Sequence, residues 1–131
     1  MYRWIEHTAE LELAIDAATR EGVFEDALTA FAELTRDGQD SGEPASQVIV
    51  VDAADPETLL ADWLSELVYL VETAAFVPER IEELALRPTS LRACVRGRHG
   101  HPAPLVKAVT YHGLELRLEA DGWHARIVLD V

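Results

Sequence analysis

Residues 105–131 read LVKAVTYHGLELRLEADGWHARIVLDV, and this stretch decides the fold class. Apolar or small residues recur at every second position near its end: Trp123, Ala125, Ile127, Leu129 and Val131. This period is typical of a strand with one buried face. Asp121-Gly122, directly before it, is a frequent hairpin turn. Because Leu105–Tyr111 and Leu114–Glu119 also have strand character, we predict antiparallel sheet here.

Shorter segments upstream carry the same strand-like patterns. They are Leu11–Asp16, Gln47–Asp52, Arg80–Leu86 and Leu91–Val95. The first alternates apolar and polar side chains, and the second has a continuous Val/Ile centre. The chain is therefore expected to contain strands on both sides of its helical region.

Two segments have helical spacing and recognisable start signals. Thr19 can cap a helix that runs to about Leu34. Asp55 followed by Pro56 predicts a second start, with a capping carboxylate and then proline at the first helical position. That helix is expected to reach at least Val71. Residues 37–46 are rich in glycine and polar side chains and are predicted to form a loop.

The order of these elements predicts the fold class. Helices come early and strands late, which favours an α+β fold over alternating α/β units. We expect residues 1–131 to form a single domain, with two helices packed on mostly antiparallel β-sheet. Cys94 is the sole cysteine, so neither an intramolecular disulfide nor a cysteine-based zinc site can form. With no apolar run of membrane-spanning length and no secretory signal, a cytoplasmic protein is expected.

The charge is strongly negative and unevenly distributed. Twenty-four acids oppose eleven bases, for a formal net charge of −13, which disfavours direct binding of nucleic acid. Residues 85–114 contain no acid, and five bases lie there: Arg87, Arg92, Arg96, Arg98 and Lys107. This basic segment either packs against the acidic body of the protein or forms a contact surface for an acidic partner or a phosphate.

No phosphate-binding glycine loop, nucleophile elbow or zinc motif is present, so the candidates for chemistry are isolated carboxylates and cations. Glu10 lies in the stretch EHTAE, residues 6–10, and the sequence ends on Asp130-Val131. If the last strand pairs near the first, Glu10 and Asp130 could share a hard divalent cation, with water or a partner completing its shell. The alternative for Glu10 is an ordinary solvated strand edge.

Lys107 is the only lysine, in a chain that otherwise uses arginine. It is either a lysine that extends along a sheet face to water or a partly desolvated cation beside the acidic site. His99 and His101, in a stretch with flanking glycines at residues 96–102, could bind a metal, but an exposed turn is the favoured explanation. Three tryptophans, Trp4, Trp63 and Trp123, are expected to be packing residues.

Four segments, in order, resemble the archease family over essentially the whole chain. Residues 6–10 (EHTAE) resemble its opening signature, and residues 59–70 (LLADWLSELVYL) its second helix. Residues 106–112 (VKAVTYH) and 129–131 (LDV) resemble its lysine-containing block and its terminus. The resemblance implies an archease-like fold and an accessory protein that is not itself an enzyme.

The resemblance also implies a partner and a site. Archeases assist RtcB-type RNA ligases, which join RNA ends in tRNA splicing and RNA repair using GTP and manganese, by promoting ligase guanylylation and repeated turnover. The metal-site residues of the family correspond to Glu10, Asp130 and Val131, which implies calcium, manganese or magnesium as cofactor. Functional roles are implied for Lys107 and for His7, which lies in the opening signature.

Glu10 stands where the family usually has aspartate, so the distance from carboxylate to metal is expected to differ. Two other functions remain as alternatives. One is a stand-alone, non-catalytic interaction module that uses its acidic helices as a surface. The other, with less support, is a hydrolase in which Glu10 and Asp130 act as an acid–base pair.

Overall fold

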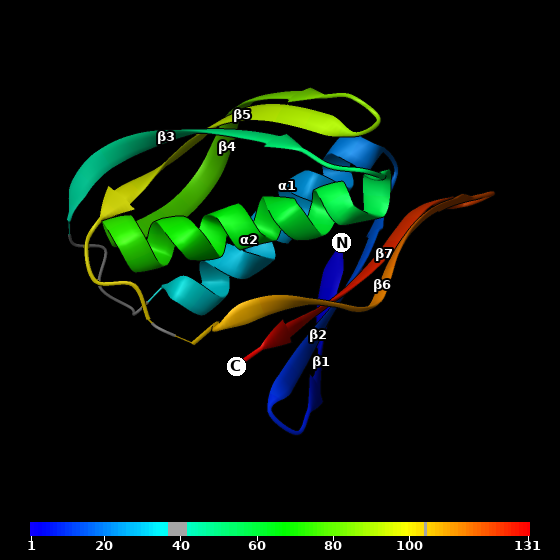
Figure 1. Cartoon of the computed structure of the whole chain (residues 1–131), viewed down its shortest axis with the longest axis horizontal. Coiled ribbons are helices and arrows are strands. Elements are labelled where there is room, and N and C mark those ends of the chain that lie inside the picture. The colour runs from blue at the N-terminus through cyan, green and yellow to red at the C-terminus, as the bar shows by residue number, and fades with distance from the viewer. Residues whose placement is uncertain (37–41, 104) are drawn as a thin grey trace.

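The computed structural model describes residues 1–36, 42–103 and 105–131. Two helices and seven strands follow one another within these ranges. They are β1 (Tyr2–His7), β2 (Glu10–Ala17), α1 (Arg20–Thr35), β3 (Glu43–Asp52), α2 (Pro56–Ala74), β4 (Phe76–Leu86), β5 (Ser90–His99), β6 (Ala108–Glu119) and β7 (Gly122–Asp130) (Figure 1).

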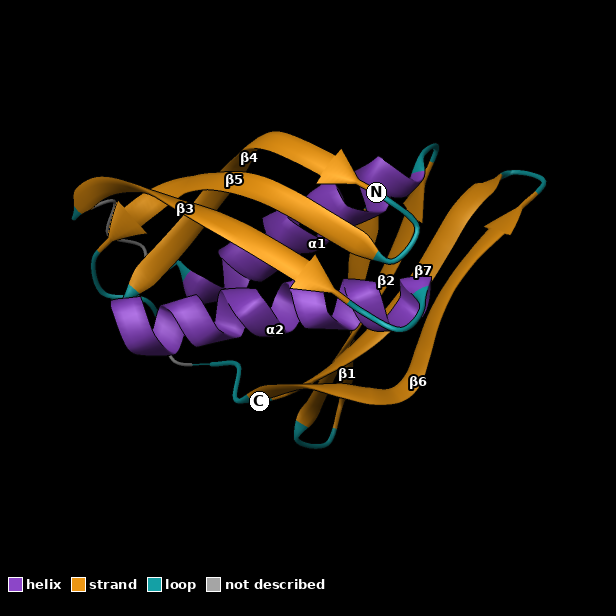
Figure 2. Cartoon of the chain, turned by 45° about the horizontal axis from the view of Figure 1, so that its top comes forward, coloured by secondary structure: helices purple, strands orange, loops and turns teal. Residues whose placement is uncertain are grey.

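The strands form two antiparallel sheets. The four-stranded sheet has the order β1-β2-β7-β6, and the three-stranded sheet has the order β3-β5-β4. Both helices lie between the two sheets, with the three-stranded sheet on one side and the four-stranded sheet on the other (Figures 1 and 2). The predicted α+β class with two helices on antiparallel sheet is confirmed.

One hydrophobic core fills the space between the sheets. Trp63 of α2 is completely buried, and its indole N–H donates a hydrogen bond to the carbonyl oxygen of Phe24 in α1, at 3.1 Å. Leu13 of β2 and Ile127 of β7, opposite each other in the four-stranded sheet, are also fully buried beneath the helices. Trp4 and Trp123 pack at the margin of this core, so the expectation that the tryptophans are packing residues is confirmed.

Both predicted helix starts are confirmed. The hydroxyl of Thr19 accepts a hydrogen bond from the backbone N–H of Gly22 at 3.0 Å. The carboxylate of Asp55 accepts one from the backbone N–H of Thr58 at 2.7 Å, and this bond holds the pKa of Asp55 below its usual value. These interactions satisfy amide groups that have no partner within the helix.

Several strands extend beyond the predicted boundaries, whereas β6 begins at Ala108, three residues after the predicted start at Leu105. β1 was not predicted, because residues 2–7 mix charged and aromatic side chains on an edge strand. Residues 37–41 of the predicted loop lie outside the described residues, but β3 begins at Glu43, so the prediction of a loop to residue 46 is wrong. β5 reaches His99, four residues beyond the predicted strand end at Val95 and into the stretch expected to be an exposed turn. In each of the extended strands, tertiary pairing lengthens the strand, and local patterns do not encode this pairing.

The two strands predicted within residues 105–119 are one strand with a wide bulge. Thr110 lies opposite Val128, but the next paired residue is Glu115, opposite Arg126. Gly113 within the bulge has φ +69°, a left-handed conformation that glycine adopts without steric cost. The hydroxyl of Tyr111, also in the bulge, donates a hydrogen bond to Asp62 of α2 at 2.5 Å. The bulge thus connects the edge of the four-stranded sheet to the helix layer.

Gly97 of β5 lies where two strands approach too closely for a side chain. A Cβ atom at this position would be 2.1 Å from the carbonyl oxygen of Val77 and 2.8 Å from the ring of Phe76. Both neighbours belong to β4, and Phe76 is completely buried. The three-stranded sheet therefore depends on the absence of a side chain here.

We predict that Gly97→Ala lowers the free energy of unfolding by about 3 kcal/mol, because β4 must move to relieve the overlap. Gly113→Ala is the control, since nothing lies within 4 Å of its Cβ position and only backbone strain of about 1 kcal/mol is expected. Urea denaturation measures both. Equal losses for the two variants would contradict the steric explanation.

Candidate functional site

The register of the four-stranded sheet brings three of the predicted site residues into one row. Glu10 of β2 lies directly opposite Asp130 of β7, and His7 of β1 lies opposite Glu10 from the other side. Residues opposite each other in antiparallel strands share a face, with Cβ atoms about 5 Å apart. Because Leu11 and Leu129, their neighbours in sequence, alternate with them, this row lies on the face turned away from the helices. We call His7, Glu10 and Asp130 the acidic row.

The carboxylates of Glu10 and Asp130 differ from that of the nearby Glu12, because of the three only Glu12 forms an ion pair within the described residues. Glu12, two residues along the same strand, forms an ion pair with Arg126 at 3.1 Å. Within the described residues, no ion pair shorter than 4.0 Å involves Glu10 or Asp130. Both are half-buried, and like charges directly opposite each other destabilise a sheet. A cation placed between them would remove this repulsion.

Two further predicted residues join this end of the sheet through their backbones. The N–H of Val131 donates to the carbonyl oxygen of Ala9 at 3.3 Å, and the N–H of Lys107 donates to that of Asp130 at 2.8 Å. Figures 1 and 2 show the C-terminal end, the β1–β2 turn and the start of β6 together at one side of the molecule. All five residues predicted for the site thus lie in one region.

The Lys107 side chain is exposed, which favours the first of its two interpretations, a lysine that extends along the sheet face to water, over a partly desolvated cation. Lys107 lines a pocket of about 430 Å³ together with Val71 and Glu72 from the last turns of α2 and with Pro102 and Val106. Strand alternation places its side chain on the helix side of the sheet, whereas the acidic row faces outward. The backbone of Lys107 is therefore hydrogen-bonded to Asp130 of the acidic row, while its side chain lies on the other face of the sheet, near α2.

The donor types of Glu10, Asp130 and Val131 suit a hard cation. Two carboxylates and a backbone oxygen of Val131 are an all-oxygen set, which suits calcium, magnesium or manganese. Calcium takes six to eight oxygen ligands, so water or a partner would supply most of the shell. The donor atoms of the predicted site therefore suit a hard cation, and the protein supplies only part of its coordination shell.

A second polar cluster, which sequence patterns did not reveal, lies at the other end of the same sheet. His124 of β7 lies between the carboxylates of Asp16 and Asp121, at 2.5 Å and 2.8 Å. The hydrogen bond to Asp121, followed by that to Asp16, raises the pKa of His124. Asp121 and His124 are three residues apart across the hairpin, a weak local signal. Asp16 is 108 residues away in sequence, and only the strand register brings it there.

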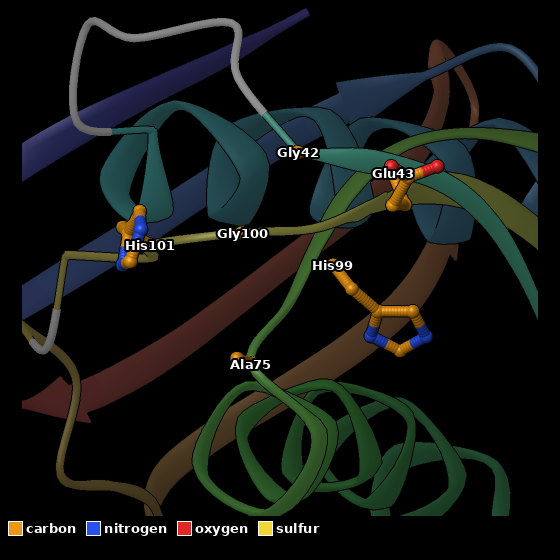
Figure 3. A pocket seen from close by; sticks show the side chains of 6 residues that line it. All are labelled: Gly42, Glu43, Ala75, His99, Gly100 and His101. Carbon is orange, nitrogen blue, oxygen red and sulfur yellow. The ribbon is translucent and has the colours of Figure 1, made fainter.

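The histidines considered as metal ligands do not converge. His99 and His101 line a pocket of about 490 Å³ beside Glu43 and Ala75, and Figure 3 shows their rings apart. The His99 ring packs edge-on against Phe76, and its Nδ1 lies 2.7 Å from the carbonyl oxygen of Ala74. His99 therefore closes the C-terminal end of α2, a structural role.

The basic segment is partly neutralised within the fold. Arg96 pairs with Glu82 at 3.3 Å, and Arg98 pairs with Glu79 at 3.6 Å. Both acids belong to β4, the neighbouring strand of the three-stranded sheet. The packing interpretation therefore holds for these two arginines. Within the described ranges, neither helix is long and apolar enough to cross a membrane.

The fold and this end of the sheet define a class of small α+β protein. In this class a pair of helices lies between two antiparallel sheets, and a carboxylate on the second strand faces a carboxylate on the last strand. The model of the Archease protein family (MTH1598/TM1083) matches residues 2–131. The chain therefore belongs to the archease family, which confirms the resemblance found in the sequence.

Individual members of the family align with this chain over nearly its whole length. The chain is 39% identical over 140 residues to the protein archease of Methanosarcina acetivorans, covering 99% of this chain and 95% of the relative. It is 33% identical over 139 residues to that of Pyrobaculum islandicum, with the same coverage.

Two solved structures share the fold. Protein 1598 of Methanobacterium thermoautotrophicum aligns with a TM-score of 0.74 and 26% identity, covering 99% of this chain and 98% of that one. An archease of Thermotoga maritima, described as a possible chaperone, aligns with a TM-score of 0.69 over 100% and 98% of the two chains. At 22% identity, this second likeness supports the fold alone.

We predict that Glu10→Gln raises the free energy of unfolding by about 0.5 kcal/mol in a metal-free, chelator-treated buffer, because it removes the repulsion with Asp130. Glu12→Gln is the matched control on the same face of β2. Since it breaks the ion pair with Arg126, it should leave stability unchanged or slightly lower. Urea denaturation compares them, and destabilisation by Glu10→Gln would refute the repulsion.

Proposed function

We propose that this protein is an accessory factor of an RtcB-type RNA ligase in tRNA splicing and RNA repair. It promotes guanylylation of the ligase and its repeated turnover, and it does not carry out the ligation itself. The observation that carries the proposal is the family match across residues 2–131, together with the row of Glu10 opposite Asp130 that this chain retains.

The placement of the acidic row suits action on a protein partner. It lies on an outward face of the sheet, beside the β1–β2 turn, where His7 is exposed. The paired ends of two inner strands, β2 and β7, hold the carboxylates more firmly than a loop would, which favours accurate placement against another protein. The net charge of −13 repels RNA, so this protein would contact the ligase while the ligase holds the RNA.

We assign the cation of this site to Glu10, Asp130 and a backbone oxygen of Val131. A bound divalent cation would supply positive charge for phosphate groups that approach from the ligase. Glu10 and Asp130 hold it through carboxylate oxygens, and the extra methylene of Glu10, relative to aspartate, lengthens the reach from β2. Water or ligase groups fill the remaining positions.

Lys107 has a separate role in this proposal. Lys107 and Glu72 of α2 both line one pocket, on the opposite side of the sheet from the carboxylates. An exposed, compact cation next to a metal-binding edge suits contact with a phosphate or an acidic side chain of the partner. The proposed setting is the cytoplasm.

An interaction module without influence on the ligase rate is the main alternative, and a carboxylate hydrolase is a weaker one. The acidic surface of this chain supports the first. The hydrolase would need a nucleophile or activated water beside Glu10 and Asp130, and within the described residues no further acid or histidine besides His7 lies opposite either of them in the strand register.

We predict that the protein raises guanylylation and multiple-turnover ligation by an RtcB-type ligase from the same organism. Glu10→Ala and Asp130→Ala should each reduce the stimulation at least tenfold, because a single carboxylate cannot hold the cation. Formation of the covalent guanylate and ligated RNA per ligase molecule are the two measurements.

The control is Glu12→Gln, which changes one charge on the same face and should leave the stimulation within about twofold of the unsubstituted protein. Binding to the ligase without any rise in turnover would support the interaction module and overturn the accessory role. Turnover of a small ester or phosphate substrate by the protein alone would favour the hydrolase.

We also predict that calcium raises the melting temperature and that Asp130→Asn abolishes the rise. A cation at one hundred times its dissociation constant stabilises a folded protein by about 2.7 kcal/mol. Thermal unfolding with calcium, manganese or magnesium, and after treatment with a chelator, measures the effect. Glu12→Gln should respond like the unsubstituted protein, and an equal rise in Asp130→Asn would place the ion elsewhere.

A further inference from the structure

His124, Asp121 and Glu119 form a cluster that the proposed ligase function does not use. One ligand atom from each of them lies within 4.8 Å of the others. The cluster occupies the β6–β7 hairpin, which projects away from the acidic row in Figures 1 and 2. Asp16, opposite His124, is six residues along β2 from Glu10, or about 20 Å away. Any ligand held here is therefore independent of the acidic row.

The hydrogen bonds of His124 determine which ring nitrogen is available. Nδ1 lies 2.5 Å from a carboxylate oxygen of Asp16, so Nδ1 carries the proton that this bond requires. Nε2 faces two further carboxylates, Asp121 at 2.8 Å and Glu119 at 3.8 Å. A lone pair on Nε2 cannot lie stably against these oxygens. A cation must lie between them, either a proton or a metal ion.

We propose that His124, Asp121 and Glu119 bind a zinc ion, or a similar first-row divalent metal, with Asp16 positioning the histidine. On binding, the metal takes the place of the proton on Nε2, which passes to water. One imidazole nitrogen and two carboxylates suit zinc, whereas calcium and magnesium prefer oxygen ligands alone. Water completes the coordination of zinc.

The distances suit such an ion. Zinc–ligand bonds of about 2.0–2.1 Å in tetrahedral geometry separate two ligand atoms by about 3.3 Å. The oxygen of Asp121 lies somewhat closer to Nε2 than this, and that of Glu119 somewhat farther. Each must move by about 0.5 Å, a small displacement for side chains that are 74% (Asp121) and 46% (Glu119) exposed.

Two arginines hold the carboxylates in place through their other oxygen atoms. Arg117 contacts Oε1 of Glu119 at 2.7 Å, which leaves Oε2 facing His124. Arg3 contacts Oδ2 of Asp16 at 3.3 Å, which leaves Oδ1 for Nδ1 of the histidine. A carboxylate that accepts the second N–H of a ligating histidine is a frequent feature of zinc sites, where it fixes the ring orientation.

An ion can reach the cluster directly. Asp16, Asp121 and His124 line a pocket of about 350 Å³ with Ala17, Ala18 and Trp123. The His124 side chain is 22% exposed, and the carboxylate of Glu119, which does not line this pocket, is 46% exposed. A histidine oriented by Asp16 and a largely exposed Asp121 carboxylate suit reversible metal binding.

Titration with zinc chloride, followed by NMR of the imidazole nitrogens, tests the proposal on the unsubstituted protein. We expect a saturable change of the His124 Nε2 resonance at one equivalent, with Nδ1 still protonated. His124 signals that stay unchanged in excess zinc would overturn the proposal and leave the cluster as an ion-pair network.

Variants separate the roles within the cluster. Asp121→Asn removes a ligand and should weaken zinc binding at least tenfold. Asp16→Asn leaves all three ligands and should weaken it about 10–100-fold through loss of histidine orientation. Glu66→Gln, an exposed acid on α2, is the charge-matched control and should bind as tightly as the unsubstituted protein. Zinc binding that survives Asp121→Asn but is lost in Glu10→Gln would place the ion at the acidic row and overturn the proposal.

Discussion

The pairing of β2 with β7 is the constraint on which the rest of the structure depends. Its register runs from Glu10 opposite Asp130 to Ala17 opposite Trp123, and it joins segments more than a hundred residues apart. The same register directs Leu13 and Ile127 into the core. A slip of one residue would turn every side chain to the other face, burying carboxylates and exposing the core. The hydrophobic core therefore fixes the positions of the polar clusters on the outer face.

Features that depend on neighbouring residues were predicted from the sequence, whereas features that depend on pairing between distant segments were not. The caps at Thr19 and Asp55 involve residues three positions apart, so both helix starts were predictable. The bulge in β6 was not, because it is a change of register against β7, and the Tyr111 contact that accompanies it reaches Asp62, 49 residues away. Glu10 and Asp130 were linked only on the condition that the last strand pairs near the first, and by resemblance to a family. His124 had neither support, so its cluster emerged only from the structure.

The charge distribution also shows why composition alone could not locate the surfaces. The acid-free segment suggested a basic surface, but Arg96 and Arg98 lie beside acids of β4. Exposed ion pairs of this kind stabilise a protein by at most about 1 kcal/mol each. Their main consequence is electrostatic, since they cancel positive charge on the three-stranded sheet. The uncompensated carboxylates of Glu10 and Asp130 then stand out from their surroundings, where Glu12 is neutralised by Arg126.

The four-stranded sheet thus presents two kinds of cation environment at its two ends. At one end the opposed carboxylates of Glu10 and Asp130 supply oxygen atoms, with the exposed His7 on the neighbouring strand. At the other end the imidazole of His124 is held between the carboxylates of Asp16 and Asp121. Hard cations favour the first set, and zinc favours the second. Because about 20 Å of paired strand separates them, a charge bound at one end acts only weakly on the other through water and salt. In the proposed ligase role, a metal at the hairpin would order the far end of the sheet without competing for the ion that the acidic row presents.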